Sequence, residues 1–157
     1  MFVNAYNDMM KNKSQLIEDI QEVITLLTNT IELDIKIASQ RNEIDVISEL
    51  IKKIVTENAR KKQDQEDYNK RYSELVKRYD KAKLVLDKAL EEKSYKESQA
   101  TRLNSFLASV QNSLSSIVSW SDELWMNMIE KAVVHRDASV TFKFINGVEK
   151  RISHQSK

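Results

Sequence analysis

The feature that most limits the fold of this chain is a stripe of apolar residues between Tyr68 and Ile117, spaced alternately by four and three positions. Its members are Tyr68, Tyr72, Leu75, Tyr79, Ala82, Leu86, Ala89, Lys93, Lys96, Ala100, Leu103, Leu107, Val110, Leu114 and Ile117. Only the two lysines interrupt it. A repeat of 3.5 residues over about seven heptads is typical of a helix in a left-handed coiled coil. We therefore predict one long helix over this stretch.

The first half of the chain carries a matching stripe that changes phase once. One set of apolar positions is Ile17, Ile20, Ile24, Leu27 and Ile31, and a second set is Leu33, Ile37, Ile44, Ile47, Ile51 and Ile54. The change follows the polar residues 28–30. We expect this half to be helical and to pack against the later helix.

The composition agrees with long, solvated helices. The chain has no proline, a single glycine and 31% charged residues with a net charge of +1. No apolar run approaches the ~18 residues that cross a bilayer, and the N-terminus lacks the apolar segment of a signal peptide. The absence of cysteine fits a reducing compartment. We expect a cytoplasmic protein without membrane contact.

The two helical halves are predicted to join at a tip near residues 59–65. Basic residues suit the C-terminal end of a helix dipole, and Asp64 can cap the helix that follows. The same residues, on two copies of the chain, could form a self-complementary contact. The candidates for it are Arg60, Lys61, Lys62, Asp64, Glu66, Asp67 and Tyr68. A solvated helix end with an ordinary cap explains them equally well.

A tip near residue 62 also sets the register between the two antiparallel helices. Lys93 is then expected opposite Ile31, and Lys96 opposite Thr28. The polar gap in one helix thus lies level with the phase change in the other, which predicts a hinge at these four residues. The alternative is that no hinge exists, and that the lysine side chains only extend to solvent past a poorly packed part of the seam.

The chain is predicted to end in a small α/β region. Ser121 can cap a helix over residues 122–132. The following stretches, "VVHRDASVTFKFI" and "NGVEKRI", are expected to form two turns and about three short strands, and Val140, Phe142 and Phe144 alternate as in a strand. Asn146-Gly147 predicts a two-residue hairpin turn. A small sheet must pack on something, and the apolar residues of segment 1–13 are available.

The expected fold is therefore mainly α. A long antiparallel two-helix coiled coil over residues 14–117 projects from a small α/β base with a short C-terminal sheet. Residues 1–13 and 118–157 build that base.

Three stretches, in order, resemble the C-terminal region of large serine recombinases, the serine integrases of phages and mobile elements. They are "AYNDMM", "ELIKKIVTENARKKQDQEDYNKRYSELVKRY" and "WSDELWMNMIEKAVVHRDASVTFKFINGVEKRI". The last block fits the family pattern at Trp120, Asp122, Glu123, Leu124, Trp125, Val133, Val134, Asp137, Phe142, Phe144, Gly147 and Glu149. It departs from the pattern at Ala138, where the family commonly has glycine.

The resemblance implies a non-catalytic fragment of such a recombinase. It implies a coiled coil whose tips contact each other between DNA-bound subunits, and whose contacts a recombination directionality factor redirects, so that excision replaces integration. The family's catalytic serine domain is absent here. Its zinc is expected in the parent protein, because this chain has no cysteine ligand. DNA is then bound through the parent protein.

The residues themselves indicate no chemistry. His135 and His154 lack companions that would make a metal site, and no serine has the neighbours of a nucleophile. Arg136, Lys143, Lys150 and Arg151 could meet DNA phosphates without reading sequence, or be ordinary surface charges. A general coiled-coil scaffold or adaptor, unrelated to recombination, is the alternative function.

Overall fold

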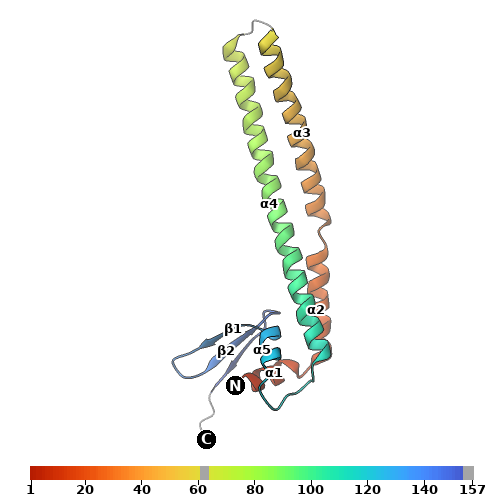
Figure 1. Cartoon of the computed structure of the whole chain (residues 1–157), viewed down its shortest axis with the longest axis vertical. Coiled ribbons are helices and arrows are strands. Elements are labelled where there is room, and N and C mark those ends of the chain that lie inside the picture. The colour runs from red at the N-terminus through yellow and green to blue at the C-terminus, as the bar shows by residue number, and fades with distance from the viewer. Residues whose placement is uncertain (61–63, 154–157) are drawn as a thin grey trace. The chain divides into compact units, whose positions relative to one another are not determined.

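The computed structural model describes residues 1–60 and 64–153, and within them it is mainly helical with an antiparallel sheet at the C-terminal end. The elements in chain order are α1 (Phe2–Met10), α2 (Lys13–Thr28), α3 (Ile31–Arg60), α4 (Gln65–Asn112), α5 (Asp122–Met128), β1 (Ile129–Val134), β2 (Val140–Phe144) and β3 (Glu149–Ile152) (Figure 1). The prediction of long helices followed by a small sheet is confirmed.

The chain divides into two compact units. Met1–Asn29 and Lys96–Lys157 form one, called here the terminal unit, and Thr30–Tyr95 form the other, called the central unit. These divisions differ from the predicted boundaries at 13/14 and 117/118. The structure groups α2 and the last part of α4 with the chain ends, because their apolar side chains belong to the same core as those of α1 and the sheet.

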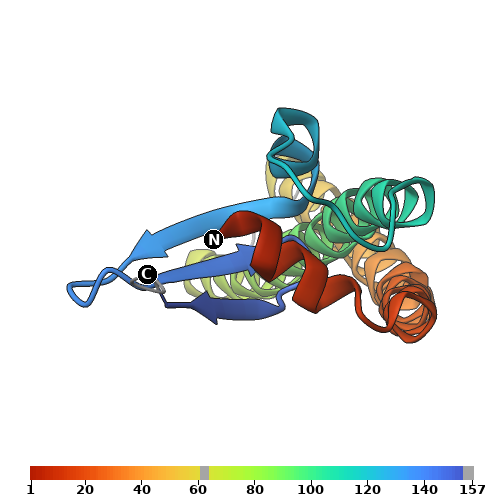
Figure 2. The same cartoon turned by 90° about the horizontal axis from the view of Figure 1, so that it is seen from below.

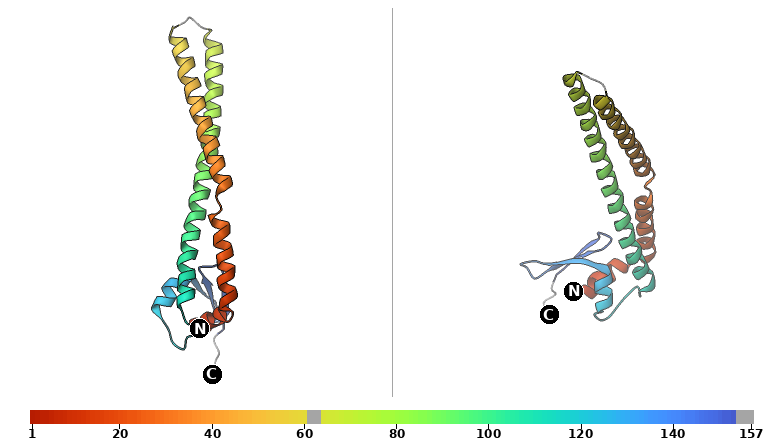
Figure 3. Two further views of the ribbon diagram at one scale, coloured as in Figure 1. Left: turned by 90° about the vertical axis from the view of Figure 1, so that its right-hand side faces the viewer. Right: turned by 45° about the horizontal axis from the view of Figure 1, so that its top comes forward.

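In the central unit, α3 and the first part of α4 lie side by side and run in opposite directions (Figure 1 and Figure 3). Leu33, Ile37 and Ala89 form a buried cluster between them. The helices are also joined by ion pairs at their exposed rims. Lys93 Nζ lies 2.7 Å from Asp34, and Arg78 Nη2 donates to Glu43 at 2.9 Å.

The terminal unit contains the larger apolar core, to which every element of the unit contributes. Its buried members are Phe2, Ala5, Tyr6, Met9, Met10, Leu16, Ile20, Leu103, Phe106, Leu107, Val110, Met128, Phe142 and Phe144. Phe2 packs against Phe142, with ring centroids 6.2 Å apart. The prediction that the opening segment supports the sheet is confirmed.

The sheet is antiparallel with the order β1-β2-β3, and α1 lies across one of its faces (Figure 1 and Figure 2). The registers place Ala132, Val134, Val140, Phe142, Phe144, Lys150 and Ile152 on this side, called the α1 face. The opposite side, called the polar face, carries Lys131, Val133, Thr141, Lys143, Glu149 and Arg151. Only the α1 face therefore joins the core, as expected for a half-covered antiparallel sheet.

Polar side chains of α1 and α2 hold the connection that follows α4. The Tyr6 hydroxyl donates to the Leu114 carbonyl. The Asn7 amide both donates to the Ile117 carbonyl, at 2.9 Å, and accepts from its N–H, at 2.8 Å. Lys13 donates to the carbonyls of Gln111 and Ser113 at the end of α4, where a cation also suits the helix dipole.

Three predicted helix features were wrong. α4 ends at Asn112, so Leu114 leaves the seam and is 74% exposed. α5 ends at Met128, and residues 129–132 belong to β1, whose β-branched run 133–134 favours a strand. Ile31 does not continue the first stripe but is 65% exposed, because the helix is interrupted just before it.

The predicted two-residue type of the Asn146-Gly147 turn was also wrong. Gly147 N–H donates to Phe144 O, and Phe144 N–H donates to Val148 O. The loop thus has three residues, a turn followed by a bulge at Gly147, whose φ is +85°. The β1–β2 loop repeats this arrangement with His135, Ala138 and Ser139, and Ala138 there has a φ of +59°.

We predict that Ala138→Gly stabilises the terminal unit by about 0.5–1 kcal/mol. It removes the ~1–2 kcal/mol cost of a left-handed alanine but adds chain entropy to the unfolded state. Gly147→Ala should destabilise by about 1 kcal/mol, through φ alone, since no atom lies within 4 Å of the added methyl group. Urea unfolding followed by tryptophan fluorescence measures both, because Trp120 and Trp125 lie in this unit. An Ala138→Gly variant that unfolds earlier would contradict this account of the turn.

Candidate functional site

The basic residues of the sheet do not form one surface. Of the four predicted candidates, Lys143 and Arg151 both lie on the polar face. Arg136 is exposed in the adjoining turn. Lys150 lies on the α1 face, level with Phe142, and its ammonium contacts Asp8 at 3.0 Å. The prediction treated the four as a group, whereas alternation along β3 sends Lys150 and Arg151 to opposite sides.

Lys131 is a third basic residue of the polar face, and the sequence reasoning missed it. It pairs with Lys143 across β1 and β2. Residues 129–132 were expected in a helix, which concealed this position. Strand structure was expected only from Val133 onward, so the start of β1 at Ile129 was placed four residues too late.

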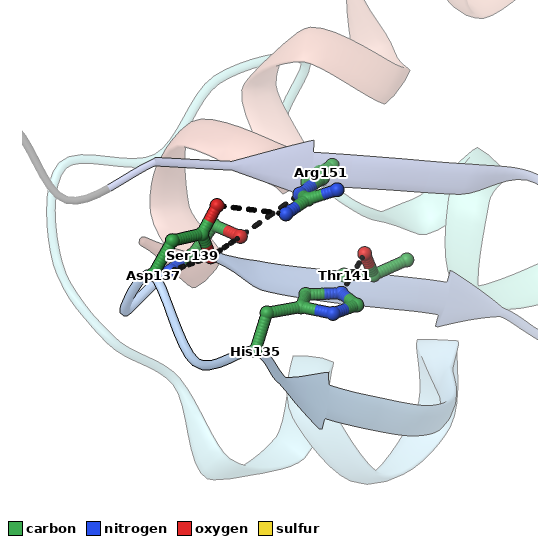
Figure 4. Close-up of polar contacts among 5 residues, drawn as sticks. All are labelled: His135, Asp137, Ser139, Thr141 and Arg151. Atoms are coloured by element: carbon green, nitrogen blue, oxygen red, sulfur yellow. Dashed lines mark hydrogen bonds and ion pairs between the residues drawn. The ribbon is translucent and has the colours of Figure 1, made fainter.

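Arg151 is held on the polar face by the β1–β2 turn (Figure 4). Its Nε donates to Ser139 Oγ and its Nη2 to Asp137 Oδ2, both at 2.8 Å. The Ser139 hydroxyl in turn donates to Asp137 Oδ1 at 2.7 Å, although Ser139 is only 1% exposed. The hydrogen bonds from Ser139, with the charge of Arg151, lower the pKa of Asp137. The carboxylate therefore stays ionised and fixes the guanidinium.

The other polar-face residues have different surroundings. His135 Nε2 lies 2.8 Å from Thr141 Oγ1 and is thus occupied by a hydroxyl (Figure 4). Lys143 lies 3.4 Å from Glu130, which is also 3.8 Å from Arg102 of α4. Arg136, by contrast, has no ion pair within residues 1–60 and 64–153. Lys131 on the polar face and Arg136 in the adjoining turn are consequently the cations most available to an anion here.

The predicted tip lies between the end of α3 and the start of α4. α3 ends at Arg60 and α4 begins at Gln65, whose side chain donates to Asn58 at 3.2 Å. Asp64 Oδ1 accepts from the N–H of Glu66 at 2.9 Å, so the predicted cap is confirmed. Lys61 and Lys62 lie outside the described residues.

Not all of the tip candidates present free groups. Asp67 forms an ion pair with Arg71 one turn later on α4, and hydrogen bonding from Arg71 lowers its pKa. Tyr68 stacks on Tyr72, with ring centroids 6.0 Å apart. Arg60 and Glu66 have no ion pair in the described part of the chain. These two opposite charges are the strongest remaining candidates for a contact.

The hinge candidates surround an interruption of the helix. α2 ends at Thr28 and α3 begins at Ile31, with Asn29 in an extended conformation. The lysines make polar contacts close to their predicted partners. Lys96 Nζ donates at 3.4 Å to the carbonyl of Asn29, next to Thr28, and Lys93 contacts Asp34, one helical turn after Ile31. The lysines thus make specific polar contacts beside the interruption, and movement at this position stays a prediction.

No histidine, aspartate and glutamate side chains of the described ranges gather into a group of three that would suit a metal ion. His154 lies beyond those ranges. None of the helices that the structure describes combines the length and apolar character of a membrane span. Comparisons with protein-family models, with curated proteins and with solved structures found no match to this chain.

The ion pair under the sheet predicts a specific dependence on pH. Hydrogen bonds from Lys11 and Lys150 lower the pKa of Asp8 from 3.8 to about 2. A depressed pKa adds stability above the unfolded value, and that stability is lost as the pH falls from about 4 to 2. Asp8→Asn should therefore lower the urea midpoint at pH 7, and the two proteins should converge near pH 2. Asp45→Asn, in the central unit, is the control; a difference between wild type and Asp8→Asn that did not depend on pH would refute the ion-pair explanation.

Proposed function

We propose that this chain is a non-catalytic part of a large serine recombinase. It comprises a coiled coil and the last part of a zinc-ribbon domain, and it mediates contacts between DNA-bound subunits during synapsis and the choice between integration and excision. The observation that carries the proposal is the order of elements: two long antiparallel helices lie between two chain ends that share one small α/β core. The resemblance of the quoted stretches implies the same order.

In this proposal α3 and the first part of α4 form a two-stranded antiparallel coiled coil. The burial of Leu33, Ile37 and Ile47 on α3, opposite Ala82 and Ala89 on α4, supports it. Small residues on one helix let large ones from the other approach closely. Rim ion pairs of about 0.2–1 kcal/mol each then select the register more than they add stability.

The tip of this coiled coil is the proposed contact between subunits. A two-fold contact brings each surface against its own copy, so one opposite-charge pair occurs twice. Arg60 and Glu66 can serve in this way because both are exposed and lie on the two sides of the turn. A recombination directionality factor is the proposed second partner, and it would compete for the same residues.

The zinc of the parent protein is not bound by these residues. The chain contains no cysteine, and the donor set that the zinc-ribbon family uses is therefore not provided here. DNA is held mainly by other domains of the parent protein, in the bacterial cytoplasm. The polar face of the sheet, with Lys131 and Arg136 exposed, adds non-specific phosphate contacts.

Self-association through the tip is tested by charge reversal. Arg60→Glu should raise the dissociation constant about tenfold in sedimentation equilibrium, because it replaces two attractions with two repulsions. A mixture of the Arg60→Glu chain with a Glu66→Lys chain should associate more tightly than either variant alone. Arg41→Glu, an exposed change on α3 away from the turn, is the matched control.

The outcome also separates the proposal from a general scaffold. A scaffold would form an oligomer along the full length of its helices, with equal affinity in wild type and in both tip variants. That result, or a mixture that associates no better than its components, would rule out the tip contact.

Phosphate contacts of the polar face are tested with a short DNA duplex. Lys131→Ala and Arg136→Ala should each weaken binding and should each reduce the slope of log affinity against log salt by about 0.9. Lys150→Ala is the control, because this lysine lies on the α1 face with Asp8. Equal effects of all three substitutions would show that net charge, rather than this face, binds the duplex.

A further inference from the structure

The two edges of the sheet differ in their protection. β3 has the sequence Glu-Lys-Arg-Ile, and its lysine forms an ion pair with α1. Charged residues and a covering helix are ways in which proteins block the pairing of an edge strand. β1 instead ends in Ala132, Val133 and Val134, all exposed, and the Val134 side chain is 75% exposed. Figure 2 shows α5 beside only the start of β1.

The backbone of β1 has free hydrogen-bonding groups at this edge. His135 N–H donates to Ser139 O across the hairpin. Backbone N–H and C=O groups point alternately to one side and the other along an antiparallel strand. Those of Val133 therefore point to β2, as those of His135 do. Ala132 and Val134 therefore direct their N–H and C=O groups outward, where an added strand would meet them.

We infer that β1 pairs with β1 of a second copy, antiparallel and centred on Val133, so that two sheets join into one. This register sets Ala132 against Val134 of the other copy, and Val133 against its own equivalent. It also brings Lys131 level with His135 of the second copy at each end. Glu130, which lies at a register irregularity and contacts Lys143, and Arg136, which lies in the turn after β1, are outside the regular pairing. A contact of this kind uses the same surface on both copies.

Neighbouring registers fit worse. Centring the pair on Ala132 sets Val133 against Lys131 and Val134 against Glu130. Centring it on Val134 sets Ala132 against Arg136 and Val133 against His135. Only the register centred on Val133 matches apolar with apolar residues. The edge is thus complementary to itself.

This contact goes beyond the proposed function, since it uses the sheet and not the tip. The chain has no cysteine, so a single introduced thiol reports proximity without background. Val133 lies on the two-fold axis in a pair without hydrogen bonds, where the Cα atoms approach to about 4.5 Å, within disulfide range. Val133→Cys should therefore form a covalent dimer under mild oxidation at least tenfold faster than Met126→Cys. Met126 is a stringent control because it is more accessible than Val133, at 75% against 38% exposed, but lies on α5.

A second experiment measures the affinity without oxidation. Val134→Lys should raise the dissociation constant of the full chain at least tenfold in sedimentation equilibrium, measured in an Arg60→Glu background that weakens the tip contact. Met126→Lys should leave it unchanged. Circular dichroism and tryptophan fluorescence check that each variant is folded.

Two results would overturn the inference. One is equal crosslinking of Val133→Cys and Met126→Cys. The other is a dissociation constant that Val134→Lys does not change. That result would exclude self-pairing and would favour an extended segment of a different protein as the partner of the β1 edge. Failure of the tip contact alone would not affect either measurement.

Discussion

The structure of the terminal unit depends on the burial of α1 between the sheet and the end of α4. Phe2, Tyr6 and Met10 are at most 4% exposed, and they contact core residues that come from the last third of the chain. Burying a side chain of this size contributes about 1.5–3 kcal/mol. A three-stranded sheet of 4–6 residues per strand has little core of its own, so without α1 its apolar face would lie in water.

The central unit is stabilised differently. Its buried side chains are few, and its contacts are between one side of α3 and one side of α4. The cost of helix nucleation is met once and each further residue adds a hydrogen bond, so helices of 30 and 48 residues form with only a narrow apolar seam between them. The further contacts between the two helices are ion pairs at the exposed rims, such as those of Lys93 with Asp34 and of Arg78 with Glu43.

Much of this organisation follows from periodicity, which is why the sequence predicts it. The spacing in α4 identified nearly all its buried positions, and Ser121 and Asp64 marked helix starts correctly. Where the prediction failed, tertiary contacts decided. α4 stops at Asn112 because Tyr6, Asn7 and Lys13 bind the next backbone groups. No local pattern near residue 112 reports partners about 100 positions earlier.

The polar face was only partly foreseeable for a related reason. The types of its residues were visible, but their side of the sheet depended on the register and on where β1 began. Arg151 became fixed by Asp137 and Ser139 only because two three-residue loops bring β1, β2 and β3 together. The loop type in turn depends on a left-handed residue, which Ala138 supplies against its intrinsic preference.

The bond from Tyr6 to Leu114 joins residues 108 positions apart, and this has a consequence for the order of folding. Closing a loop costs entropy that grows with the logarithm of its length, and distant contacts form slowly. The pairing of α3 with α4 is local by comparison and shortens the effective loop before the chain ends meet. We therefore expect the helical hairpin to assemble early, and the compaction of the two termini to be the slow step.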